Sequence, residues 1–348
     1  MKPLPIRAGL NPTRVCLPAD SAGPVSALQF VSRLIHEQRH RHPDDDDAAI
    51  AQRFADGLVR DDHGRPFAPT DLLRPGQFVN FYRRPAIERE VPGAIPVLHQ
   101  DNDLVVVDKP PFLATMPRGQ HIAQTATVKL RNQLGNPELS PAHRLDRLTS
   151  GVLMFTARRQ VRGLYQAMFE RRIPEKIYQA RTPIPPASHH HPITQFADWQ
   201  TWPDPTPETP WTLSHRMIKA RGRLAARLDV DGPPNAVTQV LGVRETQYAG
   251  RAALEWVLRP LTGKTHQLRL ALRTLGLPII NDVLYEPLTH TALYDPQAAL
   301  PSPPAVEDED FSRPLQLCAS QLRFTDPITG RRRVFTSRLG GADLESPK

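Results

Sequence analysis

Cysteine is scarce in this sequence. The 348 residues contain only Cys16 and Cys318, which lie far apart and outside any CxxC pattern. The sequence therefore indicates neither a disulfide framework nor a cysteine-ligated zinc site. So low a cysteine content is typical of a reducing compartment, and we expect a cytoplasmic protein.

Long apolar stretches are absent as well. No apolar run approaches the roughly 20 residues that a helix needs to cross a bilayer. The basic start of the chain, MKPLPIRAGLNPTRV, lacks the apolar core of a signal peptide. We therefore expect no membrane partner, and the hydrophobic content of 39% is compatible with a folded globule.

Three short patterns resemble metal or nucleotide sites but lack essential positions. The histidines at 189–191 stand between prolines without a helix-spaced partner, and the acidic run at 44–47 lacks the alternating ligands and glycine of a calcium loop. The segment TGKT at 262–265 lacks the upstream glycine of a phosphate-binding loop, because position 258 is Leu. We expect no metal site, no cofactor and no nucleotide triphosphate site.

Proline and basic residues, in contrast, are plentiful. The 38 prolines predict long irregular connections between elements. Lys and Arg outnumber Asp and Glu by 44 to 36, which gives a net charge of +8. This balance favours a phosphate-bearing partner, because each neutralised phosphate releases counterions. Many soluble proteins are basic without such a partner, so charge alone leaves the question open.

The hydrophobic pattern indicates a small N-terminal module and a larger second region. Residues 1–24 are expected to form an irregular arm, residues 25–90 a module of two helices and a short β unit, and residues 94–340 the larger region. Periodicity predicts helices at 25–40, 48–54, 127–134, 159–171 and 265–275, and strands from 58 and at 77–82, 95–98, 104–107, 151–156, 177–181, 238–244, 253–260, 315–324 and 331–336.

Two proline-rich segments interrupt the larger region. Residues 182–212 and 289–312 are expected to be irregular surface insertions. Strands and helices do not alternate steadily, so the order of elements favours an α+β fold over a doubly wound parallel sheet.

One carboxylate stands out in the segment AHRLDRLTSGVLMFT at 142–156. Asp146 lies in a polar turn between Arg144 and Arg147, just before an apolar strand. A carboxylate beside guanidinium groups stays ionised, and an ionised Asp can act as a nucleophile. It can equally be a structural ion-pair partner, and spacing alone does not separate these roles.

The segment HRLDRLTSG at 143–151 closely resembles the signature of the RluA-like pseudouridine synthases, in which HRLD-x-x-TSG carries the catalytic Asp. Four further segments resemble this family in the expected order: DNDLVVVDKPPFLATMP at 101–117, EKIYQA at 175–180, LRPLTGKTHQLRLALRTLGLPIINDVLY at 258–285 and LQLCASQLRFTDPITG at 315–330. The resemblance covers residues 94–336. It implies an α+β fold with a mixed, mainly antiparallel central sheet and flanking helices.

The resemblance implies that the protein isomerises uridine to pseudouridine in structured RNA, which is ribosomal RNA, transfer RNA or both. Asp146 matches the nucleophile, and Arg269 matches the basic residue that pairs with the catalytic Asp. Tyr178 matches the tyrosine that is expected to stack on the target base and to assist removal of the C5 proton. Arg144 matches an Arg that enters the space left by the extruded base. The target must leave its stack to be reached, and an aromatic platform offsets the lost stacking by roughly 1–3 kcal/mol.

Other polar residues of these motifs are expected to contact RNA. Besides Arg144 they are Arg147, His143, Lys109, Lys176, Lys264, His266 and Gln267. Lys264 departs from the family pattern, which usually has Arg, and so loses the bidentate fork of a guanidinium. Asp282 appears as IINDVLY where Gly-Asp is more usual, which affects a turn rather than the chemistry.

The N-terminal module distantly resembles the small RNA-binding domain with an alpha-L motif that precedes many of these synthases. In that interpretation its arginines (Arg33, Arg39, Arg53 and Arg60) meet phosphates. The alternative is a small structural cap with a solvated charged face.

Two other functions stay open. The chain could be a catalytically idle RNA-binding protein on the same scaffold, although Asp146, Tyr178 and Arg269 are all present. It could also be an unrelated hydrolase that uses paired carboxylates, such as Asp146 with Asp282. A monomer is favoured, and the sequence does not identify the RNA.

Overall fold

The computed structural model describes residues 3–21, 23–184, 203–220, 224–295, 297–299, 305 and 308–340. The chain folds as two compact units. The N-terminal unit consists of residues 1–90 and 116–139, and the larger unit consists of residues 91–115 and 140–348.

The N-terminal unit combines short strands with three helices in its described part. Its elements are β1 (Thr13–Cys16), β2 (Val25–Ser26), α1 (Ala27–His36), α2 (Asp47–Ala55), β3 (Leu72–Leu73), β4 (Phe78–Phe81) and α3 (Ala126–Gln133). Strand β1 pairs with β4 and β2 pairs with β3, both antiparallel. The strand β1 lies within the segment that was expected to be irregular.

Local sequence signals fix the two helices of the N-terminal module. Ser26 and Gln29 form a capping box at the start of α1, and the Asp46 side chain caps α2. The apolar faces of the two helices meet in one buried cluster with Val79 and Phe81 of β4. Helical spacing in the sequence therefore reports the buried face correctly here.

Residues 116–139 are tied to the preceding segment by one carboxylate. The Glu88 side chain accepts hydrogen bonds from three consecutive backbone N–H groups, those of residues 122–124, at 2.6–3.0 Å. Thr125 then caps the N-terminus of α3.

The larger unit is built on one sheet. Its elements are β5 (Val97–Gln100), β6 (Leu104–Lys109), β7 (Ser140–Pro141), β8 (Ser150–Thr156), the 3-10 helix η1 (Arg159–Val161), α4 (Arg162–Glu170), β9 (Glu175–Pro183), β10 (Trp211–Ile218), β11 (Arg227–Asp229), β12 (Ala236–Tyr248), β13 (Arg251–Pro260), α5 (Gln267–Thr274), α6 (His290–Tyr294), β14 (Leu317–Thr325) and β15 (Arg332–Thr336).

In the described residues the sheet has eleven strands. Nine follow the order β11-β10-β12-β13-β9-β14-β8-β6-β5, while β15 pairs with β14 and β7 pairs with β8. Strands β8 and β14 run parallel, and the other described pairs are antiparallel. The α+β fold with a mixed, mainly antiparallel sheet is therefore confirmed.

Gly151 makes the parallel pair possible. It lies at the start of β8 with a φ of 106°, and a Cβ atom at this position would overlap the backbone of Ala319 in β14. Only glycine allows both the backbone conformation and this close approach. The glycine of the TSG portion of the motif thus allows β8 to pair with β14 directly after the polar turn.

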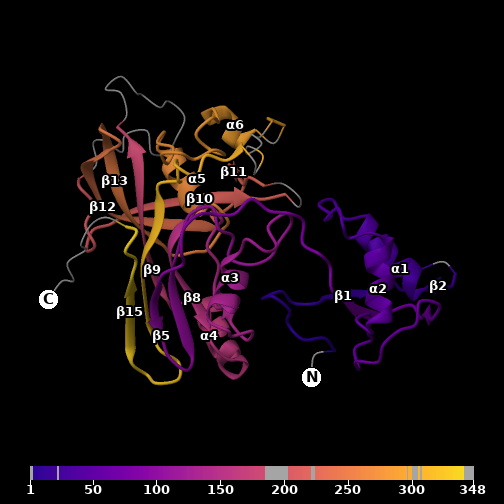
Figure 1. Ribbon diagram of the computed structural model, residues 1–348. Helices are drawn as coiled ribbons and strands as arrows, with labels where there is room; N and C mark the ends of the chain where they lie inside the picture. Colours follow the sequence, from indigo (N-terminus) through magenta and orange to yellow (C-terminus); the bar gives the residue numbers. More distant parts are fainter. Residues whose placement is uncertain are drawn as a thin grey trace. The chain divides into compact units, whose positions relative to one another are not determined.

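Two helices of the larger unit pack on different parts of the sheet (Figure 1). Helix α4 contributes Tyr165 and Met168 to a core with Val152 of β8 and Leu322 of β14. Helix α5 contacts β10, β12 and β13 and contributes Leu270 to a second core.

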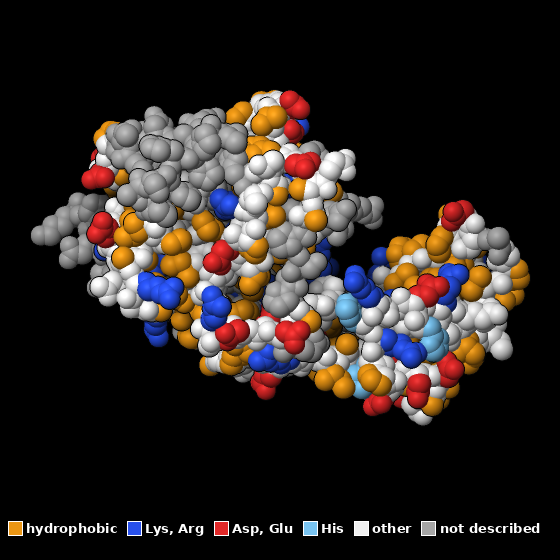
Figure 2. Space-filling model, turned by 90° about the horizontal axis from the view of Figure 1, so that it is seen from above, with side chains coloured by type: hydrophobic (Ala, Val, Ile, Leu, Met, Phe, Trp, Pro, Cys, Tyr) orange, Lys and Arg blue, Asp and Glu red, His pale blue; other side chains and the backbone are white. Residues whose placement is uncertain are grey.

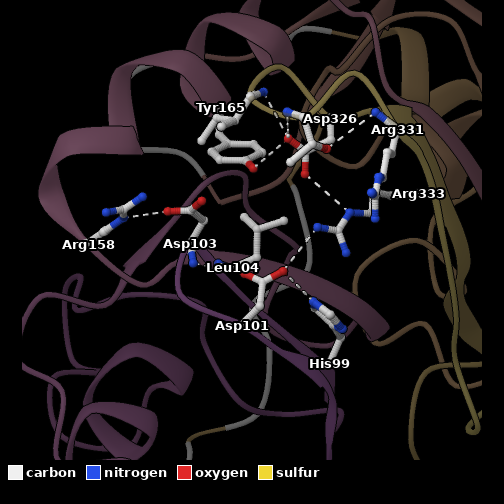
Figure 3. A network of polar contacts seen from close by, with 11 residues as sticks. His99, Asp101, Asp103, Leu104, Arg158, Tyr165, Asp326, Arg331 and Arg333 are labelled. Atoms are coloured by element: carbon white, nitrogen blue, oxygen red, sulfur yellow. Dashed lines mark hydrogen bonds and ion pairs between the residues drawn. The ribbon is translucent and has the colours of Figure 1, made fainter.

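A polar network holds β5, β6, β14, β15 and α4 together (Figure 3). Asp101 binds His99 at 2.8 Å and Arg333 at 3.1 Å. Arg333 also binds Asp326, which accepts a hydrogen bond from the Tyr165 hydroxyl at 3.1 Å. These groups satisfy one another, so the network is structural.

Several elements were not predicted from the sequence. Strand β10 and the short helix α6 overlap the two proline-rich segments, and strand β11 was also missed. The histidines at 189–191 lie outside the described residues. Among the described residues, no helix is long and apolar enough to cross a membrane, and no cluster of three metal-ligating side chains occurs.

Candidate active site

Asp146 lies in the loop between β7 and β8, and both of its neighbours are held through their backbones. The Thr115 hydroxyl donates to the Leu145 carbonyl at 2.8 Å and accepts from the Leu145 N–H at 3.1 Å. The Lys109 Nζ donates to the Arg147 carbonyl at 3.1 Å. Side chains from the end of β6 and the loop after it therefore fix the position of Asp146.

Lys109 has a structural role rather than the expected RNA contact. Its ammonium group is completely buried and donates to the carbonyls of Pro110, Leu113 and Arg147. Burial lowers the pKa of Lys109 to about 7, although the Asp146 carboxylate opposes this shift. The Lys109 Nζ therefore lies close enough to Asp146 for the carboxylate charge to affect its pKa, but it is too deeply buried to contact a ligand.

The Asp146 side chain is one-third exposed and is not saturated by the fold. Among the described residues, its side chain accepts no hydrogen bond, and the His266 Nε2 lies 4.0 Å from its Oδ2. An open carboxylate of this kind keeps lone pairs available for a ligand, as a nucleophile requires.

His266 presents Nε2 to Asp146 because the rest of the ring is held. Its backbone adopts a left-handed conformation with a φ of 60° immediately before α5. Its Nδ1 is hydrogen-bonded to the Tyr285 hydroxyl at 2.8 Å. Burial, assisted by the nearby Arg269, lowers the pKa of His266 to about 4, so the imidazole is neutral near pH 7.

Tyr178 is placed beside Asp146 by β9. Burial raises the pKa of its phenol well above the usual value, and the negative charge of Asp146 adds to this effect. Tyr178 is therefore a neutral phenol near pH 7, able to stack on a flat ligand and donate a hydrogen bond. The electrostatic coupling agrees with the expectation that Tyr178 and Asp146 share one site.

Arg269 occupies the same region, but its ion pair is with Asp282. The Arg269 Nε lies 2.7 Å from one Asp282 oxygen and Nη2 lies 2.5 Å from the other. In the described residues no ion pair within 4.0 Å joins Arg269 to Asp146, so the expected direct pairing is corrected. Arg269 instead acts on Asp146 through its charge alone.

The Asp282 side chain has a structural role, because all of its described partners are groups of the fold. It is completely buried, and its Oδ1 also accepts the N–H groups of Leu284 and Tyr285 at 3.0 Å. A carboxylate with this many partners cannot serve as the second acid of a hydrolase. The paired-carboxylate alternative therefore has no structural support.

Two more residues expected at the RNA are held inside the fold. The His143 ring stacks on Phe169 with ring centroids 4.5 Å apart, and its Nε2 accepts the Met154 N–H at 3.2 Å. Burial lowers the pKa of His143 to about 3. Gln267 is buried and bonds Thr262 and Thr238, which fixes the loop before α5.

The basic residues divide into paired and open ones. Arg147 forms a two-pronged ion pair with Glu309, with one N–O distance of 2.8 Å. Arg144 and Lys264 are exposed, and Lys176 is half-buried. The open side chains are the ones able to meet an RNA phosphate.

Sequence reasoning missed several residues that build the site. The first is Thr115, which binds the backbone of Leu145. The others are Tyr285, which binds His266, and Glu309, which pairs with Arg147. Thr115 and Tyr285 lie inside the motifs at 101–117 and 258–285, which was the available signal. Glu309 lies in a proline-rich segment and gave no signal at all.

Comparisons with known proteins identify the family of this chain. Residues 103–274 match the family described as RNA pseudouridylate synthase. An uncharacterized RNA pseudouridine synthase of Synechocystis is 30% identical, over 75% of this chain and 79% of its own length. The dual-specificity RNA pseudouridine synthase RluA of Haemophilus influenzae is also 30% identical, over 70% of this chain and 92% of its own length.

A solved structure shows the same fold. The human protein RNA pseudouridylate synthase domain containing 1 matches with a TM-score of 0.50 and 20% identity, over 71% of this chain and 85% of that chain. The sheet and the relatives together define an RNA-modifying isomerase. The chain belongs to the RluA-like family of RNA pseudouridine synthases, enzymes that convert uridine to pseudouridine.

Proposed function

We propose that Asp146 is the nucleophile of this pseudouridine synthase and that Tyr178 and His266 flank the flipped-out uracil. The observation that carries the proposal is the open Asp146 carboxylate on a loop held from both sides. Preorganisation of this kind is what a nucleophile needs, because the reacting group must already stand in position when the substrate arrives.

The reaction needs no redox partner, because product and substrate contain the same atoms. The Asp146 carboxylate forms a bond to the uridine, either at the ring or at the sugar C1′, and the N1–C1′ bond breaks. The base turns and a C5–C1′ bond forms. The C5 proton then leaves, N1 takes up a proton, and the carboxylate is released.

Tyr178 acts in this scheme as a platform for the base. Base stacking on an aromatic ring contributes about 1–3 kcal/mol, which offsets part of the cost of flipping. Its raised pKa disfavours the phenolate that direct removal of the C5 proton would require. Tyr178 is therefore assigned to stacking and hydrogen bonding rather than to acting as a base.

We infer that the substrate is transfer or ribosomal RNA, handled in the cytoplasm. A yeast protein named tRNA pseudouridine(31) synthase is 30% identical, over 56% of this chain and 48% of its own length. The N-terminal module would add phosphate contacts through the exposed Arg33 and Arg39. Arg53 is excluded from this role because it is buried against Asp45.

Pseudouridine mapping tests the proposal. Ribosomal and transfer RNA would be mapped in a strain that lacks the gene, in the same strain complemented with the wild-type gene, and with Asp146→Asn. We expect a position that loses its signal, regains it with the wild-type gene and does not regain it with the variant.

Tritium release from C5-labelled uridine gives the matching measurement with purified protein. Intact RNA binding without any release by the wild-type protein would favour the idle RNA-binding alternative. Undiminished release by Asp146→Asn would remove Asp146 from the mechanism.

A further inference from the structure

A cleft of about 490 Å³ opens between the end of α4 and the loop that precedes α5. Its volume lies within the range of about 300–1,000 Å³ that is typical of small-ligand sites. Its lining comes from two short stretches of chain, one that runs from the end of α4 to Lys176 in β9 and one that runs from Arg259 at the end of β13 to Lys264. We call it the α4–α5 cleft.

The α4–α5 cleft adjoins the Asp146 site at three points. Phe169 stacks on His143, which precedes Asp146 by three residues. Lys176 lies two residues before Tyr178 in β9, so the two side chains share one face of the sheet. Lys264 lies two residues before His266, whose Nε2 is 4.0 Å from Asp146.

The cleft carries cations that the fold does not neutralise. Among the described residues, no ion pair involves Arg172, Lys176 or Lys264. The fourth cation, Arg259, pairs with Glu175 at 3.0 Å, which leaves Glu170 as the remaining acid. Figure 2 shows a face on which basic, acidic and apolar side chains are intermixed.

Apolar side chains stand beside these cations. Ile173 is 56% exposed and Leu261 is 44% exposed, and they come from the two stretches that line the cleft. Exposed aliphatic groups next to unpaired cations fit a ligand with a negative group and a flat apolar part. A nucleotide has both.

The backbone at Arg172 supports a role for its side chain. Arg172 has a φ of 57° where α4 ends, and the Ile173 N–H closes the turn on the Met168 carbonyl at 3.1 Å. Glycine usually occupies this left-handed position, because other residues are strained there. The chain keeps an arginine at a position where glycine would be more stable.

We propose that the α4–α5 cleft binds the nucleotide next to the target uridine. Its phosphate lies against Arg172, Lys176 and Lys264, and its sugar and base lie against Ile173 and Leu261. This inference rests on the proposed function, because the neighbour of a flipped uridine must lie beside the site that receives it. The partner is single-stranded at this point, since a paired base would not reach into a cleft.

Binding of a labelled five-residue oligouridylate to the full-length protein tests the cleft without requiring catalysis. Two variants remove one charge each: Arg172→Gly, which suits the left-handed backbone, and Lys264→Gln on an exposed loop. The control is Arg251→Gln, an exposed arginine at the opposite end of β13 from Arg259. Fluorescence anisotropy at several salt concentrations gives the slope of log K against log salt.

We expect each cleft variant to weaken binding and to make the slope shallower, by no more than about 0.7, because the three cations share one single-stranded phosphate. The double variant should weaken binding further but stay within the same loss of about 0.7, and Arg251→Gln should leave the slope unchanged. Equal changes in the control and the cleft variants would mean diffuse surface attraction, and the assignment would be overturned.

Binding of linear polyphosphate of equal charge is compared with binding of oligouridylate, in order to distinguish a nucleotide site from a site for any polyanion. Ile173→Ser should weaken binding of oligouridylate several-fold and leave polyphosphate binding unchanged. Equal weakening of both ligands, or of neither, would overturn the nucleotide assignment. Tritium release by the wild-type protein is measured separately, so failure of the proposed activity is distinguished from failure of the cleft.

Discussion

Asp146 and Asp282 both lie within electrostatic reach of Arg269, yet the protein treats them in opposite ways. Asp282 is completely buried and bonded to Arg269 and to two backbone N–H groups. Asp146 is one-third exposed, and its nearest side-chain neighbour of this kind is the neutral His266, whose Nε2 lies 4.0 Å away. One carboxylate holds the fold together, and the other is left open to a ligand.

The two sites differ in whether the fold binds the carboxylate side chain or the backbone next to it. At Asp282 the side chain itself is bound, because an uncompensated buried charge would be costly. At Asp146 the backbone on either side is bound, through Thr115 and Lys109, and the carboxylate stays unsaturated. Fixing the backbone rather than the side chain keeps a reactive group in place without consuming its lone pairs.

The polar network of Figure 3 extends the same contrast. Asp326 is 2% exposed and accepts from Tyr165, from Arg333 and from the N–H groups of Ile328 and Thr329. It resembles Asp282 in being saturated. Asp146 differs from both in its unsaturated side chain, which supports the proposal that it is the nucleophile.

Replacing Asp146 and Asp282 in turn by asparagine gives the strongest test of this difference between the two carboxylates. Asp146→Asn should lower kcat by at least about 1,000-fold, since it removes the proposed nucleophile. Its free energy of unfolding should change by less than about 0.5 kcal/mol, because no hydrogen bond to the side chain is lost. Tritium release and urea unfolding measure the two quantities, and a large loss of stability would contradict the assignment.

Asp282→Asn should show the reverse pattern. The change leaves the buried Arg269 without a counter-charge, so the free energy of unfolding should fall by about 3–5 kcal/mol. Urea unfolding monitored by tryptophan fluorescence measures this loss. If Asp282→Asn stayed as stable as the wild type, the contrast between the two carboxylates would collapse.

Much of this contrast was accessible from the sequence, but not all of it. The motif around Asp146 and the helix and strand periodicity identified the fold, the loop and the neighbouring Tyr178. The partner of Arg269 was misassigned, because a basic residue at the right spacing can reach either carboxylate. Choosing between them requires the turn at residues 279–282, which brings Asp282 back onto α5.

Strand β10 was missed from the sequence for a physical reason. Strand β10 alternates buried and exposed side chains over WTLSHRMI, but only Leu213, His215 and Met217 face the core, and a proline-rich stretch precedes it. Such a short, partly polar alternation is weak evidence by itself. The strand forms because it pairs with β11 and β12, which is long-range information.

Lys109 allows a test of the loop by pH, because its Nζ binds the Arg147 carbonyl next to Asp146. Burial lowers its folded-state pKa to about 7 from 10.5. Between these values the unfolded chain keeps a proton that the folded chain has lost, so stability from this group rises with pH. The stability advantage of the wild type over Lys109→Met should therefore widen by about 2 kcal/mol between pH 7 and pH 9. An advantage of the same size at both pH values would contradict this account.

The smallest expected effect comes from Thr115, and it tests whether holding the backbone matters for chemistry. Thr115→Val leaves the N–H and carbonyl of Leu145 without this partner, which should cost about 1 kcal/mol of stability. Because the loop then positions Asp146 less well, kcat should fall about tenfold while KM stays the same. Thr115→Ser keeps the hydroxyl and should restore both values. If kcat survived in Thr115→Val while stability fell, the hydroxyl would support the fold only, and the positioning of Asp146 would have to come from Lys109 alone.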